Sequence, residues 1–399
     1  MKYDEGIDLM LKGVKGFHGK FKKVFGQMAL RLDDDAYLVS NGSLMLAGIM
    51  EDDVLVSDMK TGYLGPYFSA MPWVNAIIYG CSPDTVAVSE KYEEMPVALD
   101  DLAQIAGAYV PVIDEATPEK MAAALENSSV CLVKSSGFYA AASNMRKAVA
   151  AAQIVQKACE ALVHGEMIGG ARPMNAEVSA KLKAEFEDEY VETNQAETVE
   201  YIGYDEETFA MRNSLIETGK NLVREDLVYG AWGNLSVRVN EDRMLITPSS
   251  MDYFEIKIED IVDVDIHTMD FGEQRVPSSD ALIHAEMYKK IPGCNAIIHT
   301  HSNAMSVFAA CEAGFVINDP NMKNLIGDIR VIPFAENASE ELADNVVATM
   351  EETHAAVLSH HGAIFYGPSL EVAYKIAEAV ELTARKLLKY DWRPEDEEE

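Results

Sequence analysis

An internal repeat constrains the fold of this chain more than any other feature. Residues 71–82 read MPWVNAIIYGCS, and residues 291–302 read IPGCNAIIHTHS. A second matched pair follows in the same order, with VCLVKSSGFYAAASNMRKA at 130–148 and AVLSHHGAIFYGPSLEVA at 356–373. The spacing of about 200 residues has the size of a domain, so the sequence predicts a tandem duplication and not a solenoid of short units.

The repeat divides the 399 residues into two domains joined by a linker. The linker begins with GEMIGGARP, whose glycines and proline favour a domain break, and continues as AEVSAKLKAEFEDEYVE, which predicts an exposed charged helix. In both copies short apolar strands alternate with helices, which indicates an α/β fold. We therefore predict an N-terminal domain at 1–165, a linker helix at 166–204, a C-terminal domain at 205–392 and an acidic tail at 393–399.

Charge and cysteine content restrict the partners and the compartment. The formal net charge is −33 and the pI is about 4.6, so the chain repels nucleic acid and anionic membranes, and we expect neither as a partner. An anionic substrate would need a local cation or a cluster of backbone N–H groups. The five cysteines form no CxxC pair, and the sequence has neither a signal-peptide pattern nor an apolar run that could span a bilayer. These features predict a cytoplasmic protein with reduced thiols.

Two histidines in the motif AIIHTHS give the clearest chemical signal. Residues two apart on a strand face the same side, so His299 and His301 can point at one metal ion. The alternative interpretation is a pair of hydrogen-bonded core histidines.

A third histidine favours the metal interpretation. The motif AAVLSHHG places His360 and His361 at the end of another apolar strand, where neighbours face opposite ways and only one can join the pair. The glycine that follows lets the backbone approach closely and favours His361 as the ligand, which leaves His360 a structural or supporting role. Three imidazoles leave a coordination position open, as catalytic metal sites do.

Polar turns upstream of these histidines could bind an anion. The motif PSSD, at 277–280, precedes a predicted helix at 281–290, and hydroxyls with free N–H groups at a helix start suit a phosphate. A plain serine N-cap is the alternative. Asp280 could reach the metal or act as a general base. The turn residues that could form such a cradle are Gly233, Asn234, Ser249, Ser250, Ser278 and Ser279.

In this order and spacing, the motifs of the C-terminal half resemble the class II aldolase/adducin family. That family includes L-fuculose-phosphate aldolase, L-rhamnulose-phosphate aldolase and L-ribulose-phosphate 4-epimerase. The resemblance covers about 208–389 and rests on AWGNLSVRV, LITPSSMDY, VPSSDALIHAEMY, AIIHTHS and VLSHHGAIFYGPSLEVAYKIAEAVE. It implies two tandem three-layer α/β/α domains, each around a largely antiparallel sheet.

The resemblance also implies the roles of individual residues. It implies one divalent ion on His299, His301 and His361, zinc in the first instance, with manganese, cobalt and iron as alternatives. Asp280 falls where the aldolases have a catalytic glutamate and where the epimerase branch has aspartate. The implied ligands of a substrate phosphate are Asn234, Ser249, Ser278 and Ser279.

The sequence departs from the family pattern at three places. Ser250 stands where the phosphate loop usually ends in glycine, and Ala231 stands where a threonine often precedes the Gly-Asn turn. The family usually supplies a catalytic tyrosine from a neighbouring subunit, but the stretch FVINDPNMKNL contains none. Asp319 or Tyr390 could take its place.

The N-terminal copy lacks the chemistry of the C-terminal copy. Tyr79 and Cys81 stand where the two strand histidines should be, and Ser136 replaces His361. The segment that should carry the PSSD turn is shortened near 58–65. We expect this copy to have a structural role and to supply packing surface.

Together these features predict a metal-dependent lyase that cleaves a C–C bond of a small ketose phosphate or related sugar acid. The ion would act as a Lewis acid and stabilise the enediolate left by cleavage. A sugar-phosphate 4-epimerase, decarboxylase or dehydratase could use the same site, and a non-catalytic adducin-like interaction protein is a further alternative. Because the family commonly forms tetramers, we expect a homo-oligomer, with a closed dimer of tandem chains favoured.

Overall fold

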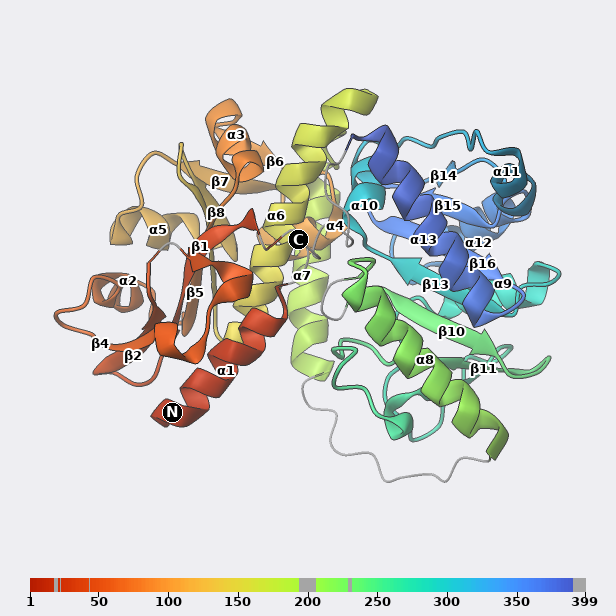
Figure 1. Ribbon diagram of the computed structural model, residues 1–399, viewed down its shortest axis with the longest axis horizontal. Helices are drawn as coiled ribbons and strands as arrows, with labels where there is room; N and C mark the ends of the chain where they lie inside the picture. Colours follow the sequence, from red (N-terminus) through yellow and green to blue (C-terminus); the bar gives the residue numbers. More distant parts are fainter. Residues whose placement is uncertain (18–20, 22, 43, 194–205, 229–231, 390–399) are drawn as a thin grey trace. The chain divides into compact units, whose positions relative to one another are not determined.

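The computed structural model describes residues 1–399 except 18–20, 22, 43, 194–205, 229–231 and 390–399 (Figure 1). The described chain divides into two compact units. The N-terminal unit comprises Met1–Glu166 and Pro173–Glu187, and the C-terminal unit comprises Met167–Arg172 and the described residues of Asp188–Asp391. Each unit contains its own mainly antiparallel sheet, which confirms the predicted fold class. Within the described ranges, no helix is long and apolar enough to cross a membrane.

The sheet of the N-terminal unit has the strand order β4-β2-β1-β5-β9-β8-β7-β6, and β3 also pairs with β1. Only β7 and β8 run parallel. The strands are β1 (Phe25–Arg31), β2 (Ala36–Ser40), β3 (Leu44–Met45), β4 (Val54–Asp58), β5 (Ala76–Cys81), β6 (Glu94–Pro96), β7 (Tyr109–Ile113), β8 (Val130–Val133) and β9 (Gly137–Ala142). The helices are α1 (Tyr3–Lys15), α2 (Gly65–Ala70), α3 (Pro83–Lys91), α4 (Asp100–Ala106), α5 (Pro118–Ala124) and α6 (Met145–Gly165).

The sheet of the C-terminal unit has the order β12-β11-β10-β13-β16-β15-β14, and only β14 and β15 run parallel. The strands are β10 (Asn234–Arg238), β11 (Arg243–Ile246), β12 (Val262–Asp265), β13 (Ala296–Thr300), β14 (Arg330–Ile332), β15 (Ala355–Leu358) and β16 (Gly362–Gly367). The helices are α8 (Glu206–Arg224), α9 (Ala281–Lys290), α10 (Asn303–Ala310), α11 (Pro320–Ile326), α12 (Glu340–Met350) and α13 (Leu370–Leu387). Strand for strand, this order repeats β4-β2-β1-β5-β9-β8-β7.

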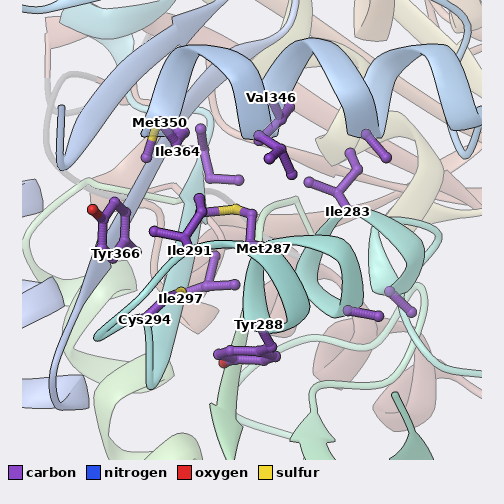
Figure 2. Close-up of a cluster of buried hydrophobic side chains, with 14 of the residues drawn as sticks. Ile283, Met287, Tyr288, Ile291, Cys294, Ile297, Val346, Met350, Ile364 and Tyr366 are labelled. Atoms are coloured by element: carbon purple, nitrogen blue, oxygen red, sulfur yellow. The ribbon is translucent and has the colours of Figure 1, made fainter. Parts of the chain in front are cut away.

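Helices cover both faces of the C-terminal sheet and give it three layers. In Figure 1, α8 and α13 lie in front of the sheet, and both contact its central strands. On the other face, α9 and α12 bury an apolar cluster against the strands (Figure 2). Ile283 and Met287 of α9 meet Val346 of α12 there, above Ile297 of β13. This core fixes α9 against the sheet, and α9 begins directly after Asp280.

The main difference between the units lies before the central strand. In the C-terminal unit α9 has 10 residues, whereas its counterpart α2 has 6 and starts at Gly65. The N-terminal unit therefore lacks the first turn of this helix, which in the C-terminal unit directly follows the PSSD motif.

The predicted linker helix is α7 (Ala176–Thr193), but it is not wholly exposed. Ser179 and Leu182 are buried. Within the N-terminal unit, the Met174 N–H donates to Val97 O and Lys183 Nζ donates to Asn127 O. The prediction of an exposed helix was wrong because it followed the many charged residues of the segment, whereas a few buried positions are enough to pack a helix. The predicted acidic tail lies outside the described residues.

Candidate metal site in the C-terminal unit

Two histidines meet at the end of strand β13. His299 lies on the strand and His301 follows it, and both are buried. Their Nε2 atoms are 2.8 Å apart, as the period of two residues on a strand requires. Gly233 makes this packing close, because a Cβ at that position would lie 2.6 Å from His299 O, and its φ of +82° suits glycine.

His361 reaches the same point from a hairpin. It follows β15 in the turn to β16, and its ring centroid lies 4.7 Å from that of His299 and 4.6 Å from that of His301. The ligand atoms of the three histidines all lie within 4.8 Å of one another. The structure thus brings the predicted set together, although the argument that placed His360 and His361 on a strand was wrong. Both are turn residues, and His360 has a left-handed φ of +60°.

A hydrogen bond on the Nδ1 side of the His299 ring decides which ring nitrogen carries the proton. Its Nδ1 lies 3.0 Å from Ala363 O, and a carbonyl oxygen can only accept. Nδ1 therefore carries the proton, and the lone pair of Nε2 points toward the other two histidines. A buried group of three imidazoles with this orientation fits a divalent transition metal.

Asp280 lies beside the histidines. Its Oδ2 is 3.8 Å from His299 Nε2 and accepts a 2.7 Å hydrogen bond from Asn234 Nδ2. Burial on its own would raise the pKa of Asp280. The facing His299 and His361 and the bond from Asn234 outweigh burial and lower the pKa to about 2. Asp280 is therefore an ionised carboxylate near neutral pH and can accept a proton.

Two of the predicted polar turns are joined next to Asp280. Ser278 N–H donates to Thr247 O, and Ser249 N–H donates to Val276 O. Ser249 Oγ lies 3.3 Å from Ser250 Oγ. Ser250 has a φ of +57°, the conformation that favours the glycine expected there.

The third turn lies directly beside the ligands, at the start of the neighbouring strand β10. Asn234 pairs with His299 in the register of β10 and β13, and Gly233 directly precedes it. Its amide donates to Asp280, so Asn234 touches the carboxylate as well as lying in the predicted cradle. Ser279 is exposed before α9.

Neither proposed stand-in for the missing tyrosine gains support. Asp319 caps α11, where its carboxylate accepts from Asn321 N and Met322 N. Tyr390 and Ala231 lie outside the described residues.

Sequence reasoning missed the residues that hold the ligand segments. Buried Glu381 of α13 accepts hydrogen bonds from Ser302 Oγ and the Met305 N–H at the start of α10, directly after His301. His360 Nε2 lies 3.5 Å from Glu312 Oε1, which also accepts from Ser359 Oγ. A glutamate inside an apolar helix pattern was the available signal for Glu381. Nothing local in the sequence marks Glu312.

The corresponding place in the N-terminal unit is closed by its own side chains. Tyr79 Oη lies 3.0 Å from Ser136 O and 3.2 Å from Ser136 Oγ. The Tyr79 and Tyr139 rings are 5.0 Å apart, and Cys81 is partly exposed at the strand end. Across the described residues, His299, His301 and His361 form the one group of three with metal-ligand geometry.

Comparisons with known proteins match both halves of the chain to one family. The family described as "Class II Aldolase and Adducin N-terminal domain" matches residues 16–163 and 213–388. The L-fuculose phosphate aldolase of Haemophilus influenzae is 33% identical over 184 residues, 45% of this chain and 82% of that protein. The 5-methylthioribulose-1-phosphate/5-deoxyribulose-1-phosphate aldolase of Rhodospirillum rubrum is 34% identical over 179 residues, 44% of this chain and 80% of that protein.

Other relatives carry different names. The 3-oxo-tetronate 4-phosphate decarboxylase of Haemophilus influenzae is 29% identical over 181 residues, 44% of this chain and 86% of that protein. A solved structure described as L-fuculose 1-phosphate aldolase has 34% sequence identity and a TM-score of 0.43, over 47% of this chain and 87% of its own.

Proposed function

This chain belongs to the class II aldolase and adducin family, and from that membership we propose that its C-terminal unit is a metal-dependent lyase. The substrate would be a small ketose phosphate or related sugar acid, cleaved at a C–C bond. Relatives named as sugar-phosphate aldolases support this class of reaction. The convergence of His299, His301 and His361 beside Asp280 is the observation that carries the proposal.

The three histidines would hold one divalent ion. Imidazole nitrogen suits zinc, and manganese, cobalt and iron are the alternatives. When bound, such an ion supplies a Lewis acid for the carbonyl and neighbouring hydroxyl of the substrate. His299 is prepared for this role, because its bond to Ala363 O turns the lone pair of Nε2 toward the other ligands.

Asp280 would move the proton. It is ionised, buried and held by Asn234, so its carboxylate is a fixed base beside the ligands. In the cleavage direction it would take the proton of the substrate hydroxyl whose carbon becomes the aldehyde. Its low pKa makes it a weak base, and exclusion of water from the site is what would let it compete for that proton.

The polar turns would hold the phosphate. Ser249 and Ser278 come from two loops that are hydrogen-bonded to each other, and Gly233, Asn234, Ser250 and Ser279 add hydroxyl, amide and N–H groups. Such a neutral cradle binds an anion through oriented donors. It would have to overcome the overall charge of −33, which opposes the approach of any phosphate.

Metal analysis followed by a substrate screen tests the proposal. We expect purified protein to carry a divalent ion, and we expect it to release an aldehyde from at least one member of a panel of ketose phosphates. Chelation should abolish the release, and adding the metal back should restore it. A metal-loaded chain that cleaves none of the panel would contradict the aldolase assignment and leave the decarboxylase, epimerase, dehydratase and adducin-like alternatives.

Decarboxylation is the second candidate, since one relative is named as a 3-oxo-tetronate 4-phosphate decarboxylase. The same metal ligands would serve it, so a parallel assay for carbon dioxide from a 3-oxo sugar-acid phosphate distinguishes the two. An epimerase or a dehydratase would convert the substrate without releasing either product.

We also propose a dimer of chains in the cytoplasm. The free thiols of all five cysteines suit a reducing compartment. In a dimer, N-terminal units could occupy the positions that simple members of the family fill with further subunits. Light scattering should then give a mass near two chains, and a monomer with full activity would overturn the idea.

A further inference from the structure

Two sets of side-chain hydrogen bonds join helix α9 to strand β10 beside the candidate metal site. Asn234 donates to Asp280 over 2.7 Å. Ser236 Oγ lies 2.7 Å from His284 Nδ1 and 2.6 Å from Tyr288 Oη. We call these five residues the polar ladder. All of them are at least nine-tenths buried.

The ladder is regular because the two elements have matching repeats. Asp280, His284 and Tyr288 are four residues apart on the helix, a rise of roughly 6 Å per step. Asn234 and Ser236 are two apart on the strand, a rise of about 6.6 Å, and face the same side. Asp280 therefore meets Asn234 and His284 meets Ser236, and Tyr288, one step further along α9, bonds to the same Ser236 hydroxyl. The backbone N–H of His284 also donates to the backbone carbonyl of Asp280, so the helical hydrogen bonds include Asp280.

These buried polar groups are a poor choice for stability alone. His284 is fully buried, and its Nε2 makes no hydrogen bond among the described residues. Burial lowers the pKa of this imidazole to about 3, although Asp280 opposes the effect, so the ring is neutral. A buried polar atom without a partner destabilises a fold, and an apolar side chain of similar size would avoid this.

The N-terminal unit has made that replacement. In the register of β1 and β5, Ala29 pairs with Ile77, as Ser236 pairs with Ile297 in the other unit. Counting back from Met71 and Ile291 in the repeat, Leu64 corresponds to His284 and Phe68 to Tyr288. Ala29, Leu64 and Phe68 pack in one apolar cluster. The unit without metal ligands thus has apolar residues at all three positions.

One polar residue of this region is retained in both units. Arg238 donates to Tyr288 O, and its counterpart Arg31 donates to Phe68 O. Both arginines tie the helix to the strand through a backbone carbonyl. Because this anchor is present with and without ligand histidines, it belongs to the fold, whereas the ladder occurs only with the chemistry.

We propose that Ser236, His284 and Tyr288 are positioning residues that hold Asp280 in register with the three histidines. This inference rests on the proposed function for its catalytic consequence, but its structural part can be tested without it. The ladder fixes α9 along β10, and Asp280 is its last step. A shift of about 1 Å in a proton-transfer group can lower turnover by roughly 10²-fold.

Exchanging the ladder for its N-terminal counterpart tests the proposal. In the variant Ser236→Ala/His284→Leu/Tyr288→Phe we expect a melting temperature equal to or above that of the parent and unchanged metal content. We expect kcat to fall by roughly 10- to 100-fold with KM changed by less than about threefold. In a crystal structure of the variant, the Asp280 carboxylate should leave Asn234. An Asp280 carboxylate that stays on Asn234, with kcat unchanged, would overturn the proposal.

Two further variants keep the test decisive. The single variant Tyr288→Phe removes one bond with little change of shape, and it serves if the triple variant does not fold. His284→Asn places an amide near the position of Nδ1 and should recover part of the lost kcat by restoring the bond to Ser236. The single variant His284→Leu is the comparison, and a kcat for His284→Asn no higher than that of His284→Leu would contradict the ladder.

The reciprocal exchange Ala29→Ser/Leu64→His/Phe68→Tyr is the matched control. It should lower the melting temperature and leave turnover per folded chain unchanged. A parent that cleaves no ketose phosphate would refute the proposed function only. The position of Asp280 in the variant crystal would still decide the structural inference.

Discussion

The two units share a strand order but differ wherever the candidate chemistry lies. His299, His301 and His361 meet in the C-terminal unit, and Tyr79 and Ser136 hydrogen-bond to each other at the corresponding place in the N-terminal unit. The sheet, the hairpin turn and the arginine anchor are present in both. The fold therefore does not depend on the three histidines. We assign to function the polar groups that occur in the C-terminal unit and not in the N-terminal unit.

The last helix of each unit, α13 and α6, differs in charge at the position that binds the serine after the central strand. Ser302 Oγ donates to Glu381, which Arg385 also binds over 2.8 Å, whereas Ser82 Oγ donates to Gln156. Both serines precede the helix after the central strand. The N-terminal unit makes this contact with a neutral amide, so a charge is not required to close the strand end. The carboxylate in the C-terminal unit instead adds a hydrogen-bond acceptor at the helix start that follows His301.

Removal of the ligands should give the largest effect. We expect about one divalent ion per parent chain, because one unit has three histidines and the other has none at those positions. His299→Ala/His301→Ala should lose the ion and reduce turnover to background. Tyr79→Ala/Cys81→Ala, the same change in the other unit, should keep both. Elemental analysis that finds two ions per parent chain, or one in the histidine variant, would break the comparison.

The glutamate contrast predicts a large loss of stability. Glu381→Gln copies the residue of the N-terminal unit but removes the carboxylate that the buried Arg385 binds. We expect the free energy of unfolding to fall by about 3–5 kcal/mol, as when one partner of a buried pair is removed. Urea unfolding measures the loss, and hydrogen exchange should localise it to α10 and α13. Glu381→Gln/Arg385→Glu, which copies Gln156 and Glu160 together, should recover part of it. A loss below about 1 kcal/mol for the single variant would show that the pair contributes little.

Substitution of the proposed base should affect turnover and not metal content. Asp280→Asn retains the shape of the side chain and removes its ability to accept the proton. Turnover should fall by roughly 10²-fold, the usual effect of losing a general base. Steady-state kinetics on a substrate from the screen, with elemental analysis of the same sample, measures both. A near-normal rate would mean that another residue moves the proton.

The histidines and polar turns could be predicted because their signals are local. A strand places residues two apart on one face, so the spacing of His299 and His301 indicated that they meet, and His361 and the family resemblance favoured a metal site. The helix predicted at 281–290 coincides with α9. The supporting contacts depend on residues far apart in sequence. Ser302 and Glu381 are separated by 79 residues, and Ser236 and His284 by 48. Whether such residues meet is decided by strand register and helix docking, which no local pattern encodes.

The ladder also predicts a difference in acid stability. The pKa of His284 is about 3 in the folded chain, below the ordinary value of 6.5. The unfolded chain therefore binds one more proton between these values, so this contribution to stability is complete above pH 6.5 and is lost as the pH falls toward 3. His284→Leu should flatten the acid limb by about 1.4 kcal/mol per pH unit. Urea unfolding of the parent and of His284→Leu between about pH 4 and about pH 7 gives the slope of the free energy of unfolding against pH for each protein. Parallel slopes would show that His284 is not buried as neutral imidazole.

The smallest effect concerns the residue before the third ligand. His360 has a φ of +60° and its counterpart Ser135 has a φ of +56°, so the left-handed conformation belongs to the hairpin and not to the metal. Each side chain contacts a glutamate, Glu312 at 3.5 Å and Glu90 at 2.8 Å. Asparagine tolerates this conformation better than most residues. His360 is buried and contacts Glu312, so His360→Asn should lower the free energy of unfolding by at most about 1 kcal/mol.

The metal content of His360→Asn shows whether His360 contributes to the metal site. If the turn alone orients His361, His360→Asn should keep about one ion per chain, since the three ligand nitrogens are untouched. Ser135→Asn should be equally mild, because the two turns are equivalent. Loss of the ion in His360→Asn alone would make His360 part of the metal site, and the hairpin would then be a place where the two units differ in more than the ligand itself.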